Sequence, residues 1–133
     1  MNNKPDYFKK AIMRGKRAIV ALTLGDGGSL TYKQVQELTG IHPYDLEAMA
    51  EENKLLRIFE HLFPACQFHN GRVLDGIEEV VKGMSQHGEW VTLSFLTSPS
   101  PRIAGDKRPI DLLRAGKKKA VLMAVRQFGE HGG

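Results

Sequence analysis

The residues best suited to metal or nucleophilic chemistry lie close together, at Cys66, His69 and His61. A zinc site would need a third and a fourth ligand beside Cys66 and His69, and none is spaced nearby. A Cys–His nucleophile pair would need an orienting group and oxyanion donors, which the sequence does not offer. Cys66 lies between Ala65 and Phe68, so we expect a buried, small apolar side chain. We therefore predict no metal site, no cofactor and no catalytic residue, and hence a protein that is not an enzyme.

The glycine-rich run at residues 25–29 is a second candidate site, because such runs can cradle phosphate groups. It matches neither of the phosphate-binding patterns, G-x-x-x-x-G-K-[ST] and G-x-G-x-x-G. We therefore expect a plain turn at this position.

A third pattern is typical of a helix-turn-helix. Thr31 and Gln34 have the spacing of a capping box, in which each side chain bonds the backbone N–H of the other at the start of a helix. Gly40 can make the turn after this helix. Pro43 suits the first position of a second helix, which we expect to end near Asn53.

Two β-prone runs, residues 55–59 and 63–68, follow the helix pair and predict a small wing. The helices and the wing together resemble the winged helix-turn-helix of excisionase and MerR proteins, which implies DNA binding. The residues able to contact DNA are Lys9, Lys10, His42, Tyr44, Asn53, Lys54 and Arg57.

The second helix of this pattern is acidic. Its exposed face is expected to carry Asp45, Glu47, Glu51 and Glu52, whereas contacts to phosphates need lysine or arginine. Two interpretations stay open: direct DNA binding, helped by the basic N-terminal arm, or a motif that is structural or binds a protein partner.

The last third of the chain carries the most specific pattern. Trp90, Leu93 and Leu96 recur at helical spacing, and a loop leads to G-x-x-R-P-I-D-L-L-R-x-G at residues 105–116. A final helix is predicted from about Lys117 to Phe128. This order resembles the toxin-binding domain of the Xre/MbcA/ParS antitoxin family. Residues 63–74 also resemble an F-P-x-x-Q-F-x-x-G-x-V-L segment of some members.

The resemblance implies a type II antitoxin that binds a RES-type, NAD-consuming toxin and blocks its active site sterically, with possible autoregulation of its operon. The alternative is a stand-alone DNA-binding regulator of phage or plasmid type. Within the resembled region the candidate partner contacts are Arg108, Asp111, Arg114, Lys117, Lys118 and Arg126. For Asp111 the competing interpretation is a favourable charge at a helix N-terminus, and for the lysines it is a solvated face.

The length of the chain limits the number of domains it can form. The 133 residues suit one domain or two very small ones. We predict a mainly α protein, with a helix-turn-helix region at residues 1–69 and a toxin-binding helical domain at residues 70–133. The core of the second domain is expected to contain Trp90, Leu93, Leu96, Leu112, Leu113, Val121, Leu122 and Val125.

The ends of the chain are basic and its middle is acidic. Residues 1–17 hold six cations and one carboxylate, residues 42–79 hold three cations and eight carboxylates, and residues 102–133 hold eight cations and three carboxylates. Such a chain can dock acidic partners or copies of itself, so we expect a homodimer or a hetero-oligomer with the toxin. A single cysteine and the absence of a long apolar run favour a cytoplasmic protein.

Overall fold

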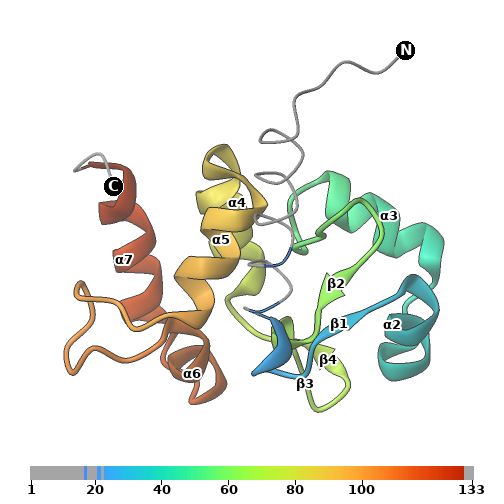
Figure 1. Ribbon diagram of the computed structural model, residues 1–133, viewed down its shortest axis with the longest axis horizontal. Helices are drawn as coiled ribbons and strands as arrows, with labels where there is room; N and C mark the ends of the chain where they lie inside the picture. The colour runs from blue at the N-terminus through green and yellow to red at the C-terminus, as the bar shows by residue number, and fades with distance from the viewer. Residues whose placement is uncertain (1–16, 18–20, 22, 131–133) are drawn as a thin grey trace.

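The computed structural model describes residues 17, 21 and 23–130 (Figure 1). The described chain is mainly helical, as predicted, and includes two small antiparallel sheets. Its elements are β1 (Ser29–Leu30), α2 (Tyr32–Thr39), α3 (Pro43–Glu51), β2 (Phe63–Pro64), η1 (Ala65–Gln67), β3 (Phe68–His69), β4 (Arg72–Val73), α4 (Ile77–Met84), η2 (Ser85–His87), α5 (Gly88–Thr97), α6 (Pro109–Arg114) and α7 (Lys118–Glu130). The spacing of Phe8, Ile12, Ile19 and Leu22 predicts helix from about Asp6 to Leu24. Most of this segment, including Lys9 and Lys10, lies outside the described residues.

The start of α2 has the predicted capping box. The Thr31 hydroxyl accepts from the Gln34 backbone N–H at 3.2 Å, and the Gln34 side chain accepts from the Thr31 N–H at 2.9 Å. The helix ends at Gly40, whose φ of 78° is a left-handed conformation that glycine adopts at little cost. His42 then caps α3 by accepting the Tyr44 N–H at 3.0 Å. Local chemistry thus fixes both ends of the connection between α2 and α3.

The strands pair differently from the predicted wing. The two predicted runs do not pair with each other: Ile58 forms an isolated bridge with Leu62, which precedes the second run, and β2 pairs with β1 instead. The hairpin in this part of the chain joins β3 to β4 through Asn70 and Gly71, whose φ angles of 53° and 73° suit a two-residue turn. This hairpin spans the predicted domain boundary at residues 69 and 70, and that division stays a prediction.

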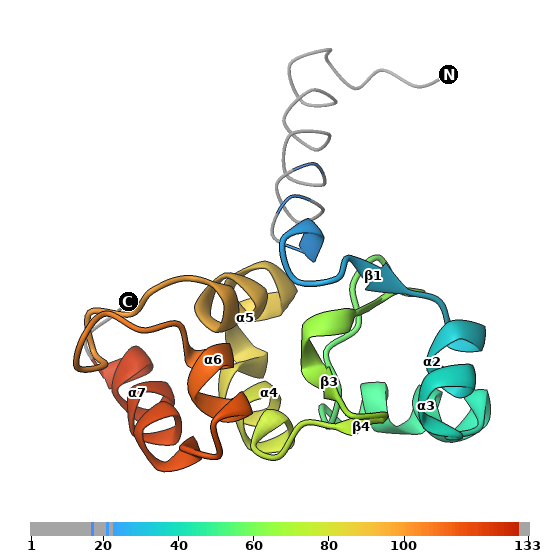
Figure 2. The ribbon, with the colours of Figure 1, turned by 90° about the horizontal axis from the view of Figure 1, so that it is seen from below.

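Figures 1 and 2 show α2 and α3 at one end of the molecule, and α4, α5, α6 and α7 at the other. Between them a buried glutamine joins two segments. The side-chain amide of Gln67 donates to the Leu56 carbonyl and accepts from its N–H, both at 2.8 Å. Gln67 belongs to the F-P-x-x-Q-F segment, so this part of the resembled motif has a structural role.

Most of the predicted C-terminal core is confirmed, but the prediction that Trp90 belongs to it is wrong. Leu93, Leu96, Leu112, Leu113, Val121 and Val125 are buried, Leu122 packs against them half-buried, and Trp90 is 42% exposed. The inward face of α5 is centred near Thr92 and Leu96. Thr92 can lie inside because its hydroxyl donates to the carbonyls of Gly88, at 2.8 Å, and Met84, at 3.3 Å. Trp90 falls outside this buried arc.

The helical spacing of Ile77, Val80, Val81 and Met84 predicts a helix from Val73 to Met84, but α4 begins only at Ile77. Gly76 precedes it with a φ of 99°, and a Cβ there would lie 2.6 Å from Leu113. Gly83 permits close packing against α7, since a Cβ there would lie 2.5 Å from Val125. No helix in the described part of the chain is long and apolar enough to cross a membrane.

Candidate binding surfaces

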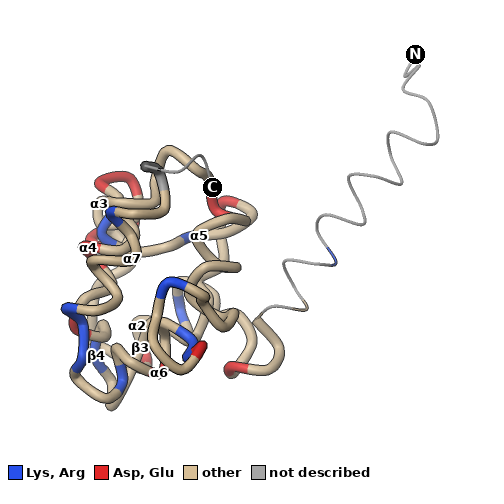
Figure 3. The backbone as a smooth tube through the Cα atoms, turned by 90° about the vertical axis from the view of Figure 1, so that its left-hand side faces the viewer, with Lys and Arg blue, Asp and Glu red and all other residues tan. Residues whose placement is uncertain are grey.

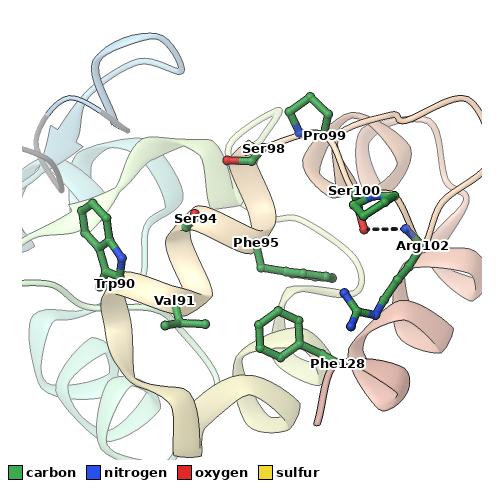
Figure 4. Close-up of a pocket in the computed structure, with 10 residues that line it drawn as sticks. Trp90, Val91, Ser94, Phe95, Ser98, Pro99, Ser100, Arg102 and Phe128 are labelled. Atoms are coloured by element: carbon green, nitrogen blue, oxygen red, sulfur yellow. Dashed lines mark hydrogen bonds between the residues drawn. The ribbon is translucent and has the colours of Figure 1, made fainter. Parts of the chain in front are cut away.

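A groove of about 200 Å³ opens beside α5 (Figure 4). Its walls come from α5, the Ser-Pro-rich loop that follows it, and the last turns of α7. The lining residues are Trp90, Val91, Ser94, Phe95, Ser98, Pro99, Ser100, Pro101, Arg102 and Phe128. In Figure 4, Trp90 lies at one end of the groove and Arg102 faces Phe128 at the other.

Aromatic packing orders the far end of this groove. The Phe128 ring meets Phe95 edge-on with 6.0 Å between centroids, and it meets His87 in the same way at 4.9 Å. The Arg102 guanidinium carbon lies 5.5 Å from the Phe128 centroid, within the range of a cation–π contact. The buried Ser100 hydroxyl accepts from the Arg102 backbone N–H at 3.3 Å. The groove therefore presents a preformed apolar surface with a cation at its rim.

An ion-pair cluster connects the start of α6 to the glycine-rich turn. Arg108 donates to both Asp26 oxygens at 3.0 and 3.1 Å, and to both Asp111 oxygens at 2.8 and 2.9 Å. Arg114 lies 3.8 Å from Asp26 and 3.5 Å from Asp111. The Asp26 side chain is only 7% exposed. The hydrogen bonds from Arg108 lower the pKa of Asp111, while Asp111 first and Asp26 second raise the pKa of Arg108.

This cluster gives a structural role to three predicted partner contacts, because Arg108 and Arg114 contact the carboxylates of Asp26 and Asp111 within the chain. Lys118 is also engaged, at 3.2 Å from both Asp75 and Glu79, and the two carboxylates raise its pKa, with Glu79 the larger cause. The other two predicted contacts, Lys117 and Arg126, are exposed.

A second cluster joins α2, α3 and the segment after α3. The Tyr32 hydroxyl donates to Glu47, and Arg57 donates at 2.8 Å to both Glu47 and Tyr32. The hydrogen bond from Tyr32, followed by that from Arg57, lowers the pKa of Glu47. Burial, followed by the bond to Glu47, raises the pKa of Tyr32. Arg57 is therefore held by a carboxylate, which weakens it as a phosphate contact.

The remaining predicted DNA contacts are not brought together as one basic surface. His42 caps α3, and Lys54 forms an ion pair with Glu52 at 3.2 Å. Asn53 has a φ of 59°, typical of the left-handed conformation that ends a helix, and Tyr44 is 78% exposed. His42 and Asn53 are also exposed, but Tyr44 offers the largest exposed apolar surface among these residues.

Cys66 is buried, as predicted, and burial first and the charge of Asp26 second raise the pKa of its thiol to about 11. Within the described residues, no group of three or more His, Cys, Asp or Glu could hold a metal ion. Sequence reasoning missed the groove, because Phe95, Arg102 and Phe128 come from separate segments. It also missed Asp26, for which the only signal was its place in a glycine-rich turn.

No family model and no curated protein matches the chain. Among solved structures, the NMR structure of Rv2175c is similar to it, with a TM-score of 0.62 and 19% sequence identity. The likeness covers 77% of this chain and 82% of that one. It therefore extends beyond either predicted domain, and at this identity it shows a shared fold alone.

Proposed function

We propose that this chain is a cytoplasmic antitoxin that neutralises a protein toxin by binding it, without catalysis of its own. The resemblance of residues 90–128 to the Xre/MbcA/ParS toxin-binding domain supplies the class of partner, a RES-type toxin that consumes NAD. The observation that carries the proposal is the groove on the same residues, with Trp90 exposed at one end.

An exposed tryptophan beside an apolar groove is a common feature of protein interfaces. Tryptophan and arginine dominate binding hot spots, because each buries a large area while it keeps a polar or charged handle. We propose a contact away from α6, because intramolecular ion pairs already engage Arg108, Asp111, Arg114 and Lys118. The partner would contact Trp90 and Arg102 first, with Lys117 and Arg126 of α7 as exposed charges at the rim.

The test is co-expression of the chain with the protein encoded by the neighbouring gene, read as rescue of growth and as co-purification of a complex. Trp90→Ala should abolish rescue while the variant still folds. Met123→Ala is a matched control, because Met123 is also an exposed apolar residue, at 47%, and lies on α7 outside the groove. Full rescue by the Trp90 variant would mean that the toxin contacts another surface. If the protein encoded by the neighbouring gene neither binds the chain nor is toxic, the antitoxin proposal is wrong.

A second candidate, a DNA-binding regulator, is favoured by the connection between α2 and α3. We propose that these helices form a helix-turn-helix, since only residues 40–42 separate them and the turn begins at a left-handed Gly40. The held Arg57 and the acidic α3 weaken this candidate. Fluorescence anisotropy with DNA from upstream of the gene, at two salt concentrations, tests it. Tight and sequence-specific binding would raise this candidate above the first.

A further inference from the structure

The exposed face of α3 combines a stripe that starts at one large aromatic ring with unbalanced negative charge. Tyr44, Ala48 and Glu51 follow one another at helical spacing, and Tyr44 is 78% exposed. Asp45 and Glu52 flank this stripe. In Figure 3, both red (Asp, Glu) and blue (Lys, Arg) segments lie near the α3 label, where α3, α4 and α7 overlap in the view. An exposed aromatic ring surrounded by carboxylates is suited to a basic, amphipathic segment and unsuited to phosphates.

Ion pairing leaves part of this charge unbalanced. Residues 43–53 hold four carboxylates and no lysine or arginine. Glu47 is engaged by Arg57, and Glu52 by Lys54. Asp45 and Glu51 are exposed and have no ion-pair partner among the described residues. The face therefore keeps a negative potential that a cationic partner would neutralise.

The chain itself contains a segment of complementary character. Residues 1–17 hold six cations and one carboxylate, which gives them a net charge of +5. Residues 43–53 have a net charge of −4, which is opposite in sign. Phe8 and Ile12 are four positions apart, a spacing that presents two apolar side chains together on a helix. This segment offers the cations that the α3 face lacks, together with apolar groups that can pack against Tyr44.

The described turn that follows this segment is anchored away from α3. The chain after residue 17 leads into the turn at residues 25–28, where Asp26 is bound by Arg108 of α6. In Figures 1 and 2, α6 and α3 lie far apart, in opposite halves of the molecule. We propose that the acidic face of α3, centred on Tyr44, receives residues 1–17 of a second copy of this chain, each copy giving its arm to the other.

This arrangement is a two-fold symmetric dimer with two identical contacts. It is independent of the toxin contact, because the groove beside α5 is not used. It also accounts for the acidic α3, since in the dimer both the arm and the helix are occupied by protein. Because the attraction is between exposed charges, salt weakens it.

The experiment is analytical ultracentrifugation of the full chain over a range of protein concentrations, at low salt and at roughly 0.5 M salt. Three variants are compared: Asp45→Lys with Glu51→Lys on α3, Lys9→Glu with Lys10→Glu in the arm, and the control Glu78→Lys with Glu89→Lys on α4 and α5. Circular dichroism first establishes that each variant folds. We expect a dimer at low salt that salt dissociates, and self-association weakened about tenfold or more by each of the first two variants.

Mixing the two charge-reversed variants provides the decisive measurement. Reversed arms then meet reversed α3 faces, so the mixture should form heterodimers more tightly than either variant forms homodimers. A full chain that stays monomeric at all concentrations overturns the proposal, including the case in which the arm binds its own α3. A dimer that both reversals leave unchanged also overturns it, and so does a dimer weakened equally by the control.

Discussion

The two ends of the molecule use their charged residues in different ways. At the α2–α3 end, Arg57 is bound by Glu47 and Tyr32 from the adjoining helices, within 25 residues of sequence. At the α5–α7 end, Arg108 is bound by Asp26, 82 positions away. The first cluster stabilises one local helix pair, whereas the second connects the C-terminal helices to the start of the described chain.

The surfaces left over differ correspondingly. Around α3 the exposed residues are Tyr44 and carboxylates, whereas beside α5 Trp90 is exposed at one end of a groove. In both places the conspicuous charged residues of the sequence motifs hold the fold, and the exposed aromatic residues are the ones free to bind. A charged motif alone is therefore a weak guide to a binding site, since a carboxylate elsewhere in the chain can neutralise it.

The largest expected effect is a difference in unfolding free energy between alanine variants of a buried and an exposed residue of α5. Leu93 is fully buried, so Leu93→Ala should lower the free energy of unfolding by about 3 kcal/mol through lost burial and the cavity it leaves. Trp90→Ala should lower it by about 1 kcal/mol or less, because the ring is 42% exposed. Urea unfolding followed by circular dichroism measures both. Equal losses would show that Trp90 belongs to the core after all.

The next largest effect is a difference in stability loss when the central arginine of each ion-pair cluster is removed. Arg108→Ala leaves the nearly buried Asp26 without its main partner, so we expect a loss of about 2 kcal/mol, moderated because Arg108 itself is 30% exposed. Arg57→Ala should cost less, because Glu47 is 47% exposed and water can replace the missing partner.

A double-mutant cycle of Arg108→Ala with Asp26→Asn measures the coupling directly, and Arg108→Ala with Glu78→Gln is its control. The first pair should be strongly non-additive, and the control pair additive. Additivity in the first pair would mean that the cluster does not join the turn to α6.

Local elements of the fold could be predicted from the sequence, because their causes lie within a few residues. The capping box of Thr31 and Gln34, the turn at Gly40 and the place of Pro43 at the first position of α3 are all confirmed. The pairing of β1 with β2 and the contact between Asp26 and Arg108 join segments far apart in sequence, and no periodicity encodes such contacts. Trp90 was misplaced because spacing gives the width of an apolar stripe but not its centre.

A third effect concerns the start of α2. Thr31→Ala removes the hydroxyl that accepts the Gln34 N–H, and it should cost about 1 kcal/mol. Thr31→Ser keeps the acceptor and is the matched control, with little expected change. Helix α6 has no side-chain cap, so Arg108→Ala cannot act in this way and its loss reports the ion pairs. Thermal unfolding measures the threonine variants, and identical midpoints for alanine and serine would mean that the capping box adds no stability.

The smallest effect is a pH dependence that distinguishes the causes acting on two exposed carboxylates. The pKa of Asp111 is lowered first by Arg108, whereas the pKa of Glu47 is lowered first by the Tyr32 hydroxyl and then by Arg57. A lowered pKa in the folded state stabilises the protein above the ordinary pKa of the group, near 4, and this stabilisation is lost as the pH falls through the folded-state value.

Carbon-detected NMR titration can follow each carboxylate separately. Arg108→Ala should raise the pKa of Asp111, and Tyr32→Phe should raise that of Glu47, each without moving the other. Added salt should raise the pKa of Asp111 more than that of Glu47, because salt screens a charge but not a hydrogen bond from a neutral hydroxyl. An equal salt response at the two sites would mean that the guanidinium of Arg57, rather than Tyr32, sets the pKa of Glu47, and the two clusters would then share one electrostatic cause.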